Sequence, residues 1–415
     1  MTIAYRATAA VACLSLLAAC SGGGDHGRPS AGPATTASAA PAPSLSPGPS
    51  RTPQAPPFST RWKEFEKLPL LTASGLVDVV ATGPRQAWAL GYEDGAEDSD
   101  GSTVVLRWNG ATWSKLPGTP AVGGYDGLDA GGPDDLWIVA GDTVAHWDGR
   151  RWTRTRPFGI SEDKFFDDVA TDGDTAVLIG ASEDGAPFIV TGRRDRFRLQ
   201  FSPEGVLDAV TSGSGHAWIV GAAPHRDCAE VTPLVVHSRK AGREGYGQWE
   251  AMRVPLVPGG TLTSVVQISP TDVWAVGKIV ENARVERIPG RPCGEWVSGV
   301  LAETDSPALP LALHWDGRSW KQVALPPMNA ELTGVTAFGP DDVWVTARDR
   351  DRPDVPVFLR FDGRGWTAER AGHGTVTAVA AIPGTKDLWA VGWPGEYTDD
   401  GREYLLRRGG RGRPG

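Results

Sequence analysis

The densest group of potential metal ligands in this 415-residue chain is an acidic segment between residues 93 and 101. It contains Asp94, Glu97, Asp98 and Asp100, and clustered carboxylates are the ligands that hard cations such as Ca²⁺ take. The segment lacks the alternating ligand series of a dedicated calcium loop. A solvated acidic loop is therefore the favoured interpretation and a Ca²⁺ site the alternative. No other cofactor is expected.

Four more aspartates recur at one place in a repeated motif and could be taken for paired catalytic carboxylates. They are Asp135, Asp272, Asp342 and Asp387. Each lies in a short turn between two apolar runs, where an aspartate side chain commonly hydrogen-bonds the backbone. We therefore expect these residues to stabilise hairpin turns and not to catalyse a reaction.

The histidines and possible nucleophiles do not form a known catalytic or metal-binding pattern. The seven histidines are scattered, without HExxH or zinc spacing, and no GxSxG motif is present. His146 and His314 occupy equivalent repeat positions, which indicates a structural role. No catalytic residue is predicted.

Ligand-binding residues are better sought in the segments between the repeats, because scaffolds place function on variable loops. Trp296 and Trp393 fall outside the repeat and are predicted to lie in loops. His225, Arg226 and Tyr397 lie in similar insertions. These five residues are the candidate ligand-binding set.

The four cysteines divide into two pairs. Cys13 and Cys20 belong to an N-terminal apolar segment, which leaves Cys228 and Cys293 for the rest of the chain. In an exported protein an even pair can oxidise. We predict a disulfide between Cys228 and Cys293; two free thiols are the alternative.

The elements that carry these residues repeat about every 49 residues. A first motif, best seen in SPTDVWAVG (Ser269 to Gly277), occurs seven times, and a second, best seen in LHWDGRSW (Leu313 to Trp320), follows it after a variable gap. Short alternating strands with this period indicate a β-propeller. The predicted fold is all-β, with seven four-stranded antiparallel blades.

The seventh copy of the second motif is missing at the C-terminal end. The segment from Trp62 to Leu68 supplies a matching outer strand, so we predict that it pairs beside residues 403–407 and closes the ring. Fifteen of the seventeen tryptophans lie at three recurring positions and are expected to pack between blades. A carbohydrate-binding aromatic stripe is the alternative interpretation.

The two ends of the propeller differ in their loops. Large insertions follow the second strand of several blades, at residues 91–102, 222–233, 278–310, 348–356 and 393–403. In an antiparallel blade these loops lie opposite the two hairpin turns. We therefore predict one undecorated face and one elaborated face, and place binding on the elaborated one.

The chain ends carry targeting and linker signals. Residues 1–20 form a predicted signal peptide that ends in LAAC (Leu17 to Cys20), which resembles a bacterial lipobox, so Cys20 is the expected lipidation site. Residues 21–59 are a predicted disordered tether rich in Pro, Ala and Ser. The propeller is assigned to residues 60–406 and a disordered basic tail to 407–415. A net charge of −9 argues against a nucleic-acid partner.

The repeat resembles those of secreted bacterial β-propellers of the kelch and galactose-oxidase-like kind over nearly all of the chain beyond the tether. Kelch repeats usually carry a Gly-Gly pair after the second strand, whereas a single glycine recurs here, at Gly91, Gly221, Gly277 and Gly392. The D-G-x-x-W spacing also differs from that of sialidase-like Asp boxes. The resemblance implies the fold and assigns no active site.

These observations predict a monomeric binding module anchored by lipid on the outer face of the bacterial cytoplasmic membrane, with a protein or glycan partner. The alternative is a propeller hydrolase or lyase acting on cell-envelope or extracellular polysaccharide. Two convergent carboxylates in a central funnel would favour the enzyme. A purely structural envelope protein would have no concave site. Fold alone does not decide between these classes.

Overall fold

The computed structural model describes residues 56–409, except 66, 72–73, 95–100, 121–125, 156–163, 184, 194–195, 201–203, 225–229, 242–244, 282, 288–295, 302–306 and 394–403. Side chains are described for all of these residues apart from 284–287 and 296–301. Within this part of the chain, no helix has the length and apolar character needed to cross a membrane.

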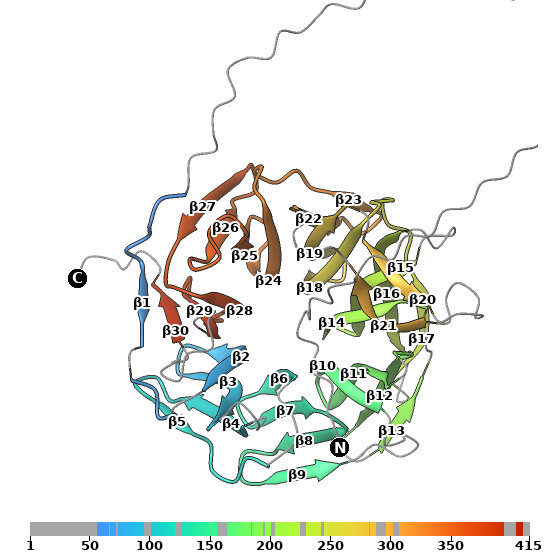
Figure 1. Cartoon of the computed structure of the whole chain (residues 1–415). Coiled ribbons are helices and arrows are strands. Elements are labelled where there is room, and N and C mark those ends of the chain that lie inside the picture. Colours follow the sequence, from blue (N-terminus) through green and yellow to red (C-terminus); the bar gives the residue numbers. More distant parts are fainter. Residues whose placement is uncertain are drawn as a thin grey trace, which may run out of the picture. The chain divides into compact units, whose positions relative to one another are not determined.

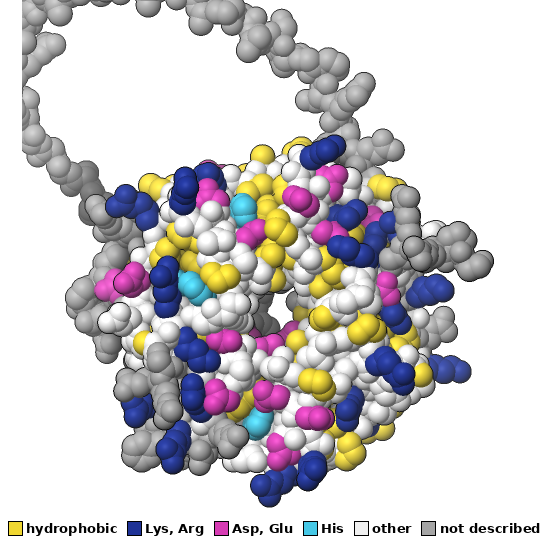
Figure 2. All heavy atoms as spheres, turned by 180° about the vertical axis from the view of Figure 1, so that it is seen from behind, with side chains coloured by type: hydrophobic (Ala, Val, Ile, Leu, Met, Phe, Trp, Pro, Cys, Tyr) yellow, Lys and Arg dark blue, Asp and Glu magenta, His cyan; other side chains and the backbone are white. Residues whose placement is uncertain are grey.

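Seven four-stranded antiparallel sheets form a ring (Figure 1), and a space-filling view shows an open channel at its centre (Figure 2). Blade 1 contains β2 (Gly75–Gly83), β3 (Gln86–Glu93), β4 (Ser102–Trp108) and β5 (Trp113–Lys115), and blade 2 contains β6 (Gly127–Gly132), β7 (Asp135–Ala140), β8 (Thr143–Trp147) and β9 (Trp152–Thr155). Blade 3 contains β10 (Lys164–Asp172), β11 (Thr175–Ser182), β12 (Pro187–Arg193) and β13 (Arg196–Leu199). Blade 4 contains β14 (Val206–Gly213), β15 (His216–Pro224), β16 (Val231–Ala241) and β17 (Gly245–Ala251).

Blade 5 contains β18 (Gly260–Ser269), β19 (Asp272–Val280), β22 (Ala308–Trp315) and β23 (Trp320–Gln322), and a two-stranded ribbon, β20 (Arg284–Arg287) with β21 (Trp296–Leu301), is inserted before β22. Blade 6 contains β24 (Ala330–Gly339), β25 (Asp342–Asp349), β26 (Val357–Phe361) and β27 (Trp366–Arg370). Blade 7 contains β28 (Thr375–Ala381), β29 (Leu388–Trp393) and β30 (Tyr404–Arg408) from the C-terminal end, completed by β1 (Trp62–Glu64).

The predicted blade count and ring closure are confirmed. β1 pairs with β30 in antiparallel register, with Trp62 opposite Arg408. The Trp62 ring lies 3.9 Å from that of Phe358 in blade 6. The indole Nε1 donates to Glu369 at 2.9 Å. The short strand β1 therefore completes the sheet of blade 7 and also contacts the neighbouring blade 6.

The chain pairs with the ring even before β1. The backbone N–H of Ser59 donates to the Arg370 carbonyl, and the Arg370 N–H donates to the Pro57 carbonyl, each at 2.8 Å, so Phe58 forms a parallel bridge on the outer edge of β27. Residues 56–59 were assigned to the disordered tether from composition, and that boundary is wrong, because an extended Pro-rich segment can still pair with an open strand edge.

The C-terminal boundary also needs correction. Arg407 and Arg408, which we assigned to a disordered tail, are the last two residues of β30. Arg407 donates to Asp387 at 2.8 Å, and the buried Arg408 donates to Glu369 at 2.6 Å. Their basic character made them look like solvated tail residues, whereas each has a carboxylate partner far away in the sequence.

The tryptophans pack between blades, as predicted. The indole on the second strand of one blade contacts aromatic side chains on the third and fourth strands of the next. Such groups are Trp88 with Trp147 and Trp152, Trp218 with Trp315 and Trp320, Trp274 with Phe361 and Trp366, and Trp389 with Trp108 and Trp113. Aromatic pairs of this kind add to the free energy gained by burying their area.

The recurring glycine after the second strand is explained by a close approach. In most blades the first strand carries a β-bulge opposite this glycine, such as that between Leu76 and Asp78. A Cβ added at Gly91 would collide with the Gly75 carbonyl oxygen, and one at Gly277 with that of Thr261. Glycine is therefore required by the bulge, and a second glycine is not.

Candidate functional site

We name the two ends of the ring by their connections. The hairpin face carries the first-to-second and third-to-fourth hairpins of each blade, and the loop face carries the second-to-third connections and the links between blades. On the hairpin face, four blades use the predicted tight turn, in which Asn109, Asp148, Asp316 or Asp362 accepts two backbone N–H groups.

Next to these turns, four blades share one arrangement of three side chains. It consists of an aspartate, a histidine or arginine, and a tryptophan. In blade 2, Asp135 Oδ1 lies 2.6 Å from His146 Nε2, and the His146 ring stacks on Trp137 with centroids 4.2 Å apart. Blade 5 repeats this with Asp272, His314 and Trp274, at 2.9 and 4.5 Å. We call this group the blade triad.

Blades 6 and 7 use arginine in the same place. Arg360 Nε donates to Asp342 at 2.8 Å and lies over Trp344; Arg407 does the same with Asp387 and Trp389. Our expectation that these aspartates bond the turn backbone is wrong, since their carboxylates bond side chains on the third strand. The conclusion that they are structural stands, because arginine and histidine substitute for each other in an arrangement built around the inter-blade tryptophan.

Blade 4 departs from this arrangement. His216 occupies the aspartate position, and its Nδ1 lies 2.9 Å from Nε2 of His237, which packs against Trp218. Burial, with His216 and Arg239 nearby, lowers the pKa of His237 to about 4. Burial and Arg239 also lower the pKa of His216. The pair is therefore uncharged at neutral pH, whereas blades 6 and 7 hold an arginine–aspartate ion pair at this place.

The hairpin of blade 4 is also different. Where blades 2, 5 and 6 have a D-G-x-x-W turn, blade 4 has HSRKAGREGYGQW (His237 to Trp249), which lengthens β16 and β17. Tyr246 folds back into the core, with its hydroxyl 2.9 Å from the Asp172 carboxylate and 3.0 Å from the His216 carbonyl oxygen. Burial and the Asp172 hydrogen bond raise the pKa of Tyr246, so the phenol stays protonated. Lys240 donates to the Asp172 carbonyl at 2.9 Å.

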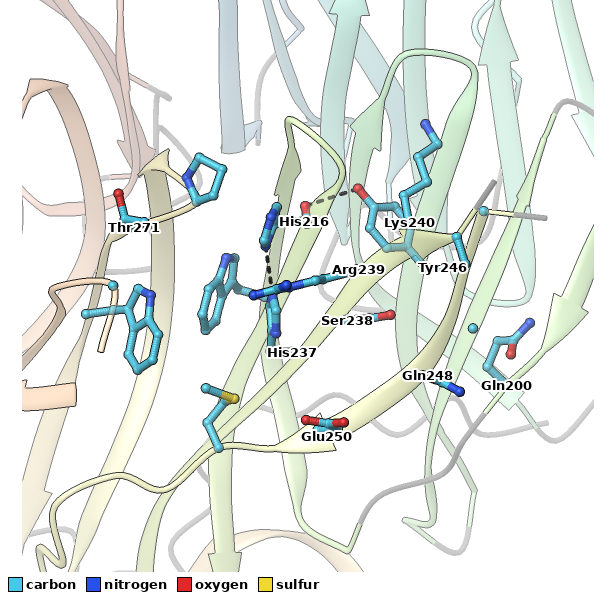
Figure 3. A pocket seen from close by; sticks show the side chains of 18 of the residues that line it. Gln200, His216, His237, Ser238, Arg239, Lys240, Tyr246, Gln248, Glu250 and Thr271 are labelled. Atoms are coloured by element: carbon cyan, nitrogen blue, oxygen red, sulfur yellow. Dashed lines mark hydrogen bonds between the residues drawn. The ribbon is translucent and has the colours of Figure 1, made fainter. Parts of the chain in front are cut away.

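This hairpin borders a cavity of about 1120 Å³ between the outer parts of blades 4 and 5 (Figure 3). We call it the blade 4–5 groove. Figure 3 shows Arg239 beside the joined His216 and His237 rings. Gln248 and Glu250 of β17 and Met252 beyond it line one wall, and Thr271, Trp315 and Gly317 of blade 5 line the other. The lining is mixed polar and apolar, which suits a ligand with both kinds of group.

Free charge in the groove is mainly positive. Among the described residues, no hydrogen-bond or ion-pair partner is found for Arg198 or Arg239, both of which are exposed. Lys240 is balanced by Asp172, 3.5 Å away, and Glu250 is the acidic residue of the lining. This local balance contrasts with the net charge of −9 for the chain.

A related cavity of about 360 Å³ lies at the same place between blades 6 and 7. It is lined by Trp344, Arg360, Thr367 and Glu369, which correspond to Trp218, His237, Glu250 and Met252 of the blade 4–5 groove. The chain's own residues 57–61 line this second cavity. An extended segment already lies against the outer edge of blade 6, whereas no described residue covers the outer edge of β17.

The central channel contains a third set of titratable groups. Figure 2, which views the ring from behind, shows acidic side chains at the wall of the opening. Asp78, Asp129 and Asp168 lie on the first strands of blades 1, 2 and 3, and each is partly exposed. Desolvation raises their pKa values, that of Asp78 to about 7. The carboxylate of Asp78 also raises the pKa of Asp168, and that of Asp129 raises the pKa of both.

These carboxylates have a structural function. Asp78 accepts the Leu128 N–H at 3.0 Å, and Asp168 accepts that of Val210 at 2.8 Å, so each links one blade to the next. At the equivalent position in blade 5, the hydroxyl of Ser264 accepts the N–H of Val335 in blade 6. Because a serine replaces the aspartate at the same joint, backbone pairing explains the position of these acids.

The predicted site residues are only partly described. Asp94 follows β3 with a left-handed backbone (φ 57°), but Glu97, Asp98 and Asp100 lie outside the described residues. So do His225, Arg226, Tyr397, Cys228 and Cys293. Trp393 is half-buried at the end of β29, and Trp296 begins β21, so both belong to strands and the prediction of loops is wrong for them.

Within the described part, no three His, Cys, Asp or Glu side chains are arranged to hold a metal ion.

The predicted contrast between the two faces also needs correction. The hairpin face is not undecorated, since the longest third-to-fourth hairpin rises there and borders the blade 4–5 groove. His216, His237, Arg239 and Gln248 were not among the predicted residues. A signal was present, because blade 4 alone replaces the tight turn by a long segment while keeping the closing tryptophan, Trp249.

Comparisons with known proteins give distant structural similarities alone. No protein-family model and no curated protein matches the chain. Among solved structures, Ycf48 bound to a D1 peptide is 12% identical with a TM-score of 0.49, covering 86% of this chain and 100% of its own. The extracellular domain of the putative one-component system BT4673 from B. thetaiotaomicron is 10% identical with a TM-score of 0.48, covering 83% of this chain and 40% of its own. The N-terminal domain of Nup159 is 12% identical with a TM-score of 0.46, covering 85% and 97%.

Proposed function

We propose that this protein is a binding module, held by lipid at the outer face of the cytoplasmic membrane, which recruits a partner protein through the blade 4–5 groove. The departure of blade 4 from the blade repeat carries the proposal. The blade triad and the tight turn both change there, and the changed residues border one cavity of about 1120 Å³. A scaffold needs neither the lengthened hairpin nor the His216–His237 pair, since blades 2, 5 and 6 close without them.

The shape of the site favours a polypeptide partner over catalysis. The groove is wide and open, it lies beside an uncovered strand edge, and its residues are mixed polar and apolar. The hydrolase or lyase alternative would require carboxylates free to act on a substrate. The converging acids of the channel, Asp78, Asp129 and Asp168, are instead engaged with backbone N–H groups of adjoining blades.

The proposal can be tested by filling the groove without disturbing the core. Gly247 lines the groove, has no left-handed backbone requirement, and has nothing within 4 Å of a Cβ placed there. A displayed library of random peptides would be selected on the purified full chain and on Gly247→Trp. We expect the unaltered chain to enrich related sequences and Gly247→Trp to enrich none.

Gly132→Trp is the matched control. Gly132 lies in the first hairpin of blade 2, and a Cβ there also meets nothing within 4 Å. This variant adds the same bulk to the same face but away from the groove, so it should enrich the same peptides as the unaltered chain. Failure of the unaltered chain to enrich any sequence, or equal enrichment by Gly247→Trp, would overturn the proposal.

A further inference from the structure

The chemistry of the blade 4–5 groove can be taken one step further, on the basis of the function proposed above. In blades 2, 5, 6 and 7 an aspartate at the start of the second strand pairs with the histidine or arginine across from it. In blade 4 the imidazole of His216 stands at that place, and Arg239 extends beside it. The groove therefore has imidazole and guanidinium groups at the blade triad position but lacks the carboxylate that they would bind.

The molecule also shows how an extended segment can occupy such a groove. Residues 56–59 run along the outer edge of β27 by backbone pairing, next to Trp344 and Arg360. Trp218 and His237 hold the corresponding places in the blade 4–5 groove, and β17, with seven residues, offers a longer outer edge than the five-residue β27. Adding a strand to an exposed edge gives affinity through the backbone, and neighbouring side chains give selectivity.

We propose that the blade 4–5 groove binds an extended, acidic peptide segment. The backbone of the segment adds to the outer edge of β17, and one of its carboxylates pairs with Arg239 and the His216–His237 pair. Arg198, at the end of the cavity nearer blade 3, provides a second cation for a segment with more than one acidic residue. Glu250 disfavours a further acidic side chain opposite the C-terminal end of β17, which restricts where the acidic residues of the segment can lie.

The test uses a random octapeptide library divided into three pools, in which one central position is fixed as Glu, Gln or Lys. The unaltered chain should bind the Glu pool about tenfold more tightly than the Gln pool, because a charge-assisted hydrogen bond is worth about one order of magnitude in affinity or more. It should bind the Lys pool most weakly. Arg239→Glu should reverse the order of the Glu and Lys pools.

His216→Asp is the sharper variant. It gives blade 4 the aspartate that four other blades carry, so the variant should fold, and the built-in carboxylate should remove the preference for Glu over Gln. Gln86→Asp is its control, because Gln86 holds the same position in blade 1, two residues before Trp88, and the change alters net charge equally. This control should keep the preference of the unaltered chain.

The outcomes separate the two proposals. Equal binding of the three pools, blocked by Gly247→Trp, would leave the binding module standing and overturn the acidic ligand. Loss of the Glu preference in Gln86→Asp to the same extent as in His216→Asp would also overturn it, because overall charge would then be responsible. Absence of binding in every pool would count against both proposals.

Discussion

At the scale of single residues, the side chains that look most catalytic hold blades together. Asp78, Asp129 and Asp168 converge at the channel, yet each accepts a backbone N–H from the next blade. A buried carboxylate that accepts such bonds has a structural cause for its position, and its raised pKa follows from desolvation. His216 replaces the aspartate of the blade triad, and Arg239 beside it has no hydrogen-bond or ion-pair partner among the described residues.

The acids of the channel predict how stability depends on pH. Desolvation raises the pKa of Asp78 from 3.8 to about 7 and also raises the pKa values of Asp129 and Asp168, so between pH 4 and 7 the folded chain keeps protons that the unfolded chain has lost. The free energy of unfolding should therefore fall as pH rises through this window. The lowered pKa of His237 acts in the opposite direction but is outnumbered. Urea unfolding at pH 5 and at pH 7.5 measures the difference, and we expect greater stability at pH 5.

Asp78→Ser provides the control for this dependence. Ser264 accepts the equivalent backbone N–H in blade 5, so a serine at position 78 can keep the link while removing a titrating group. Stability should then change less between pH 5 and pH 7.5. An equally steep change in this variant would show that Asp78 does not contribute.

At the scale of elements, the ring depends on a segment of only three strand residues, β1. Its contribution comes from the buried Trp62, which packs on Phe358 of blade 6 while the backbone pairs with blade 7. Residues 56–59 add a second contact on β27. A propeller has no covalent bond between its first and last blades, so a strand from the opposite end of the chain removes an edge that would otherwise stay open.

Trp62→Ala should destabilise the propeller by about 3–5 kcal/mol, because it removes a large side chain that is only 8% exposed and the hydrogen bond to Glu369. Chemical denaturation measures the loss. Phe58→Ala is the comparison, since Phe58 is 60% exposed and its removal should cost less than about 1 kcal/mol. Equal effects of the two substitutions would refute the proposed role of β1.

A disulfide between Cys228 and Cys293 is the second prediction at this scale. Both cysteines lie outside the described residues, but the two insertions that contain them make contact: the N–H of Val231, three residues after Cys228, donates to the carbonyl of Ala283, ten residues before Cys293, at 3.0 Å. In the chain-entropy model, a bridge closing a loop of about 65 residues stabilises by about 4 kcal/mol. Thiol alkylation without reductant should label neither cysteine, and reduction should lower the melting temperature. Full labelling before reduction would exclude the bridge.

At the scale of the whole molecule, blade 4 combines a changed blade triad with a lengthened hairpin on the hairpin face of the ring. Seven similar blades make a rigid frame, and a frame with one altered sector is suited to recognition. We propose that the Pro-, Ala- and Ser-rich segment after Cys20 acts as a tether between the membrane and the ring.

Cys20→Ala should release the protein from membranes or stall its processing, because the lipid would be attached to that sulfur. Membrane fractionation with metabolic lipid labelling is the measurement. Cys13→Ala, which changes the other cysteine of the same segment, should leave labelling and retention unaltered. Unchanged retention and labelling in Cys20→Ala would contradict the anchor.

The sequence alone determined the fold, the number of blades and the strand that closes them. These features follow from a local repeat, because most blades carry their own aromatic, turn and bulge-glycine residues and each blade packs on its neighbours. The repeat period therefore predicts the number of blades, and the one missing copy of the second motif predicts the strand that closes the ring. Two boundaries were misjudged, because Phe58 and Arg408 look like linker and tail until their partners, Arg370 and Glu369, are known.

Only the tertiary structure decided where the candidate site lies. Tyr246 meets Asp172 across 74 residues, and Asp168 meets Val210 across 42, and no local pattern predicts such pairs. The sequence placed binding on the loop face because insertions are visible there as added length. The blade 4–5 groove is instead made by a change of residue type, His216 for aspartate, and by one lengthened hairpin. The groove can be recognised as a candidate binding site only in the folded structure, where His237, Arg239 and an uncovered strand edge lie at the same cavity.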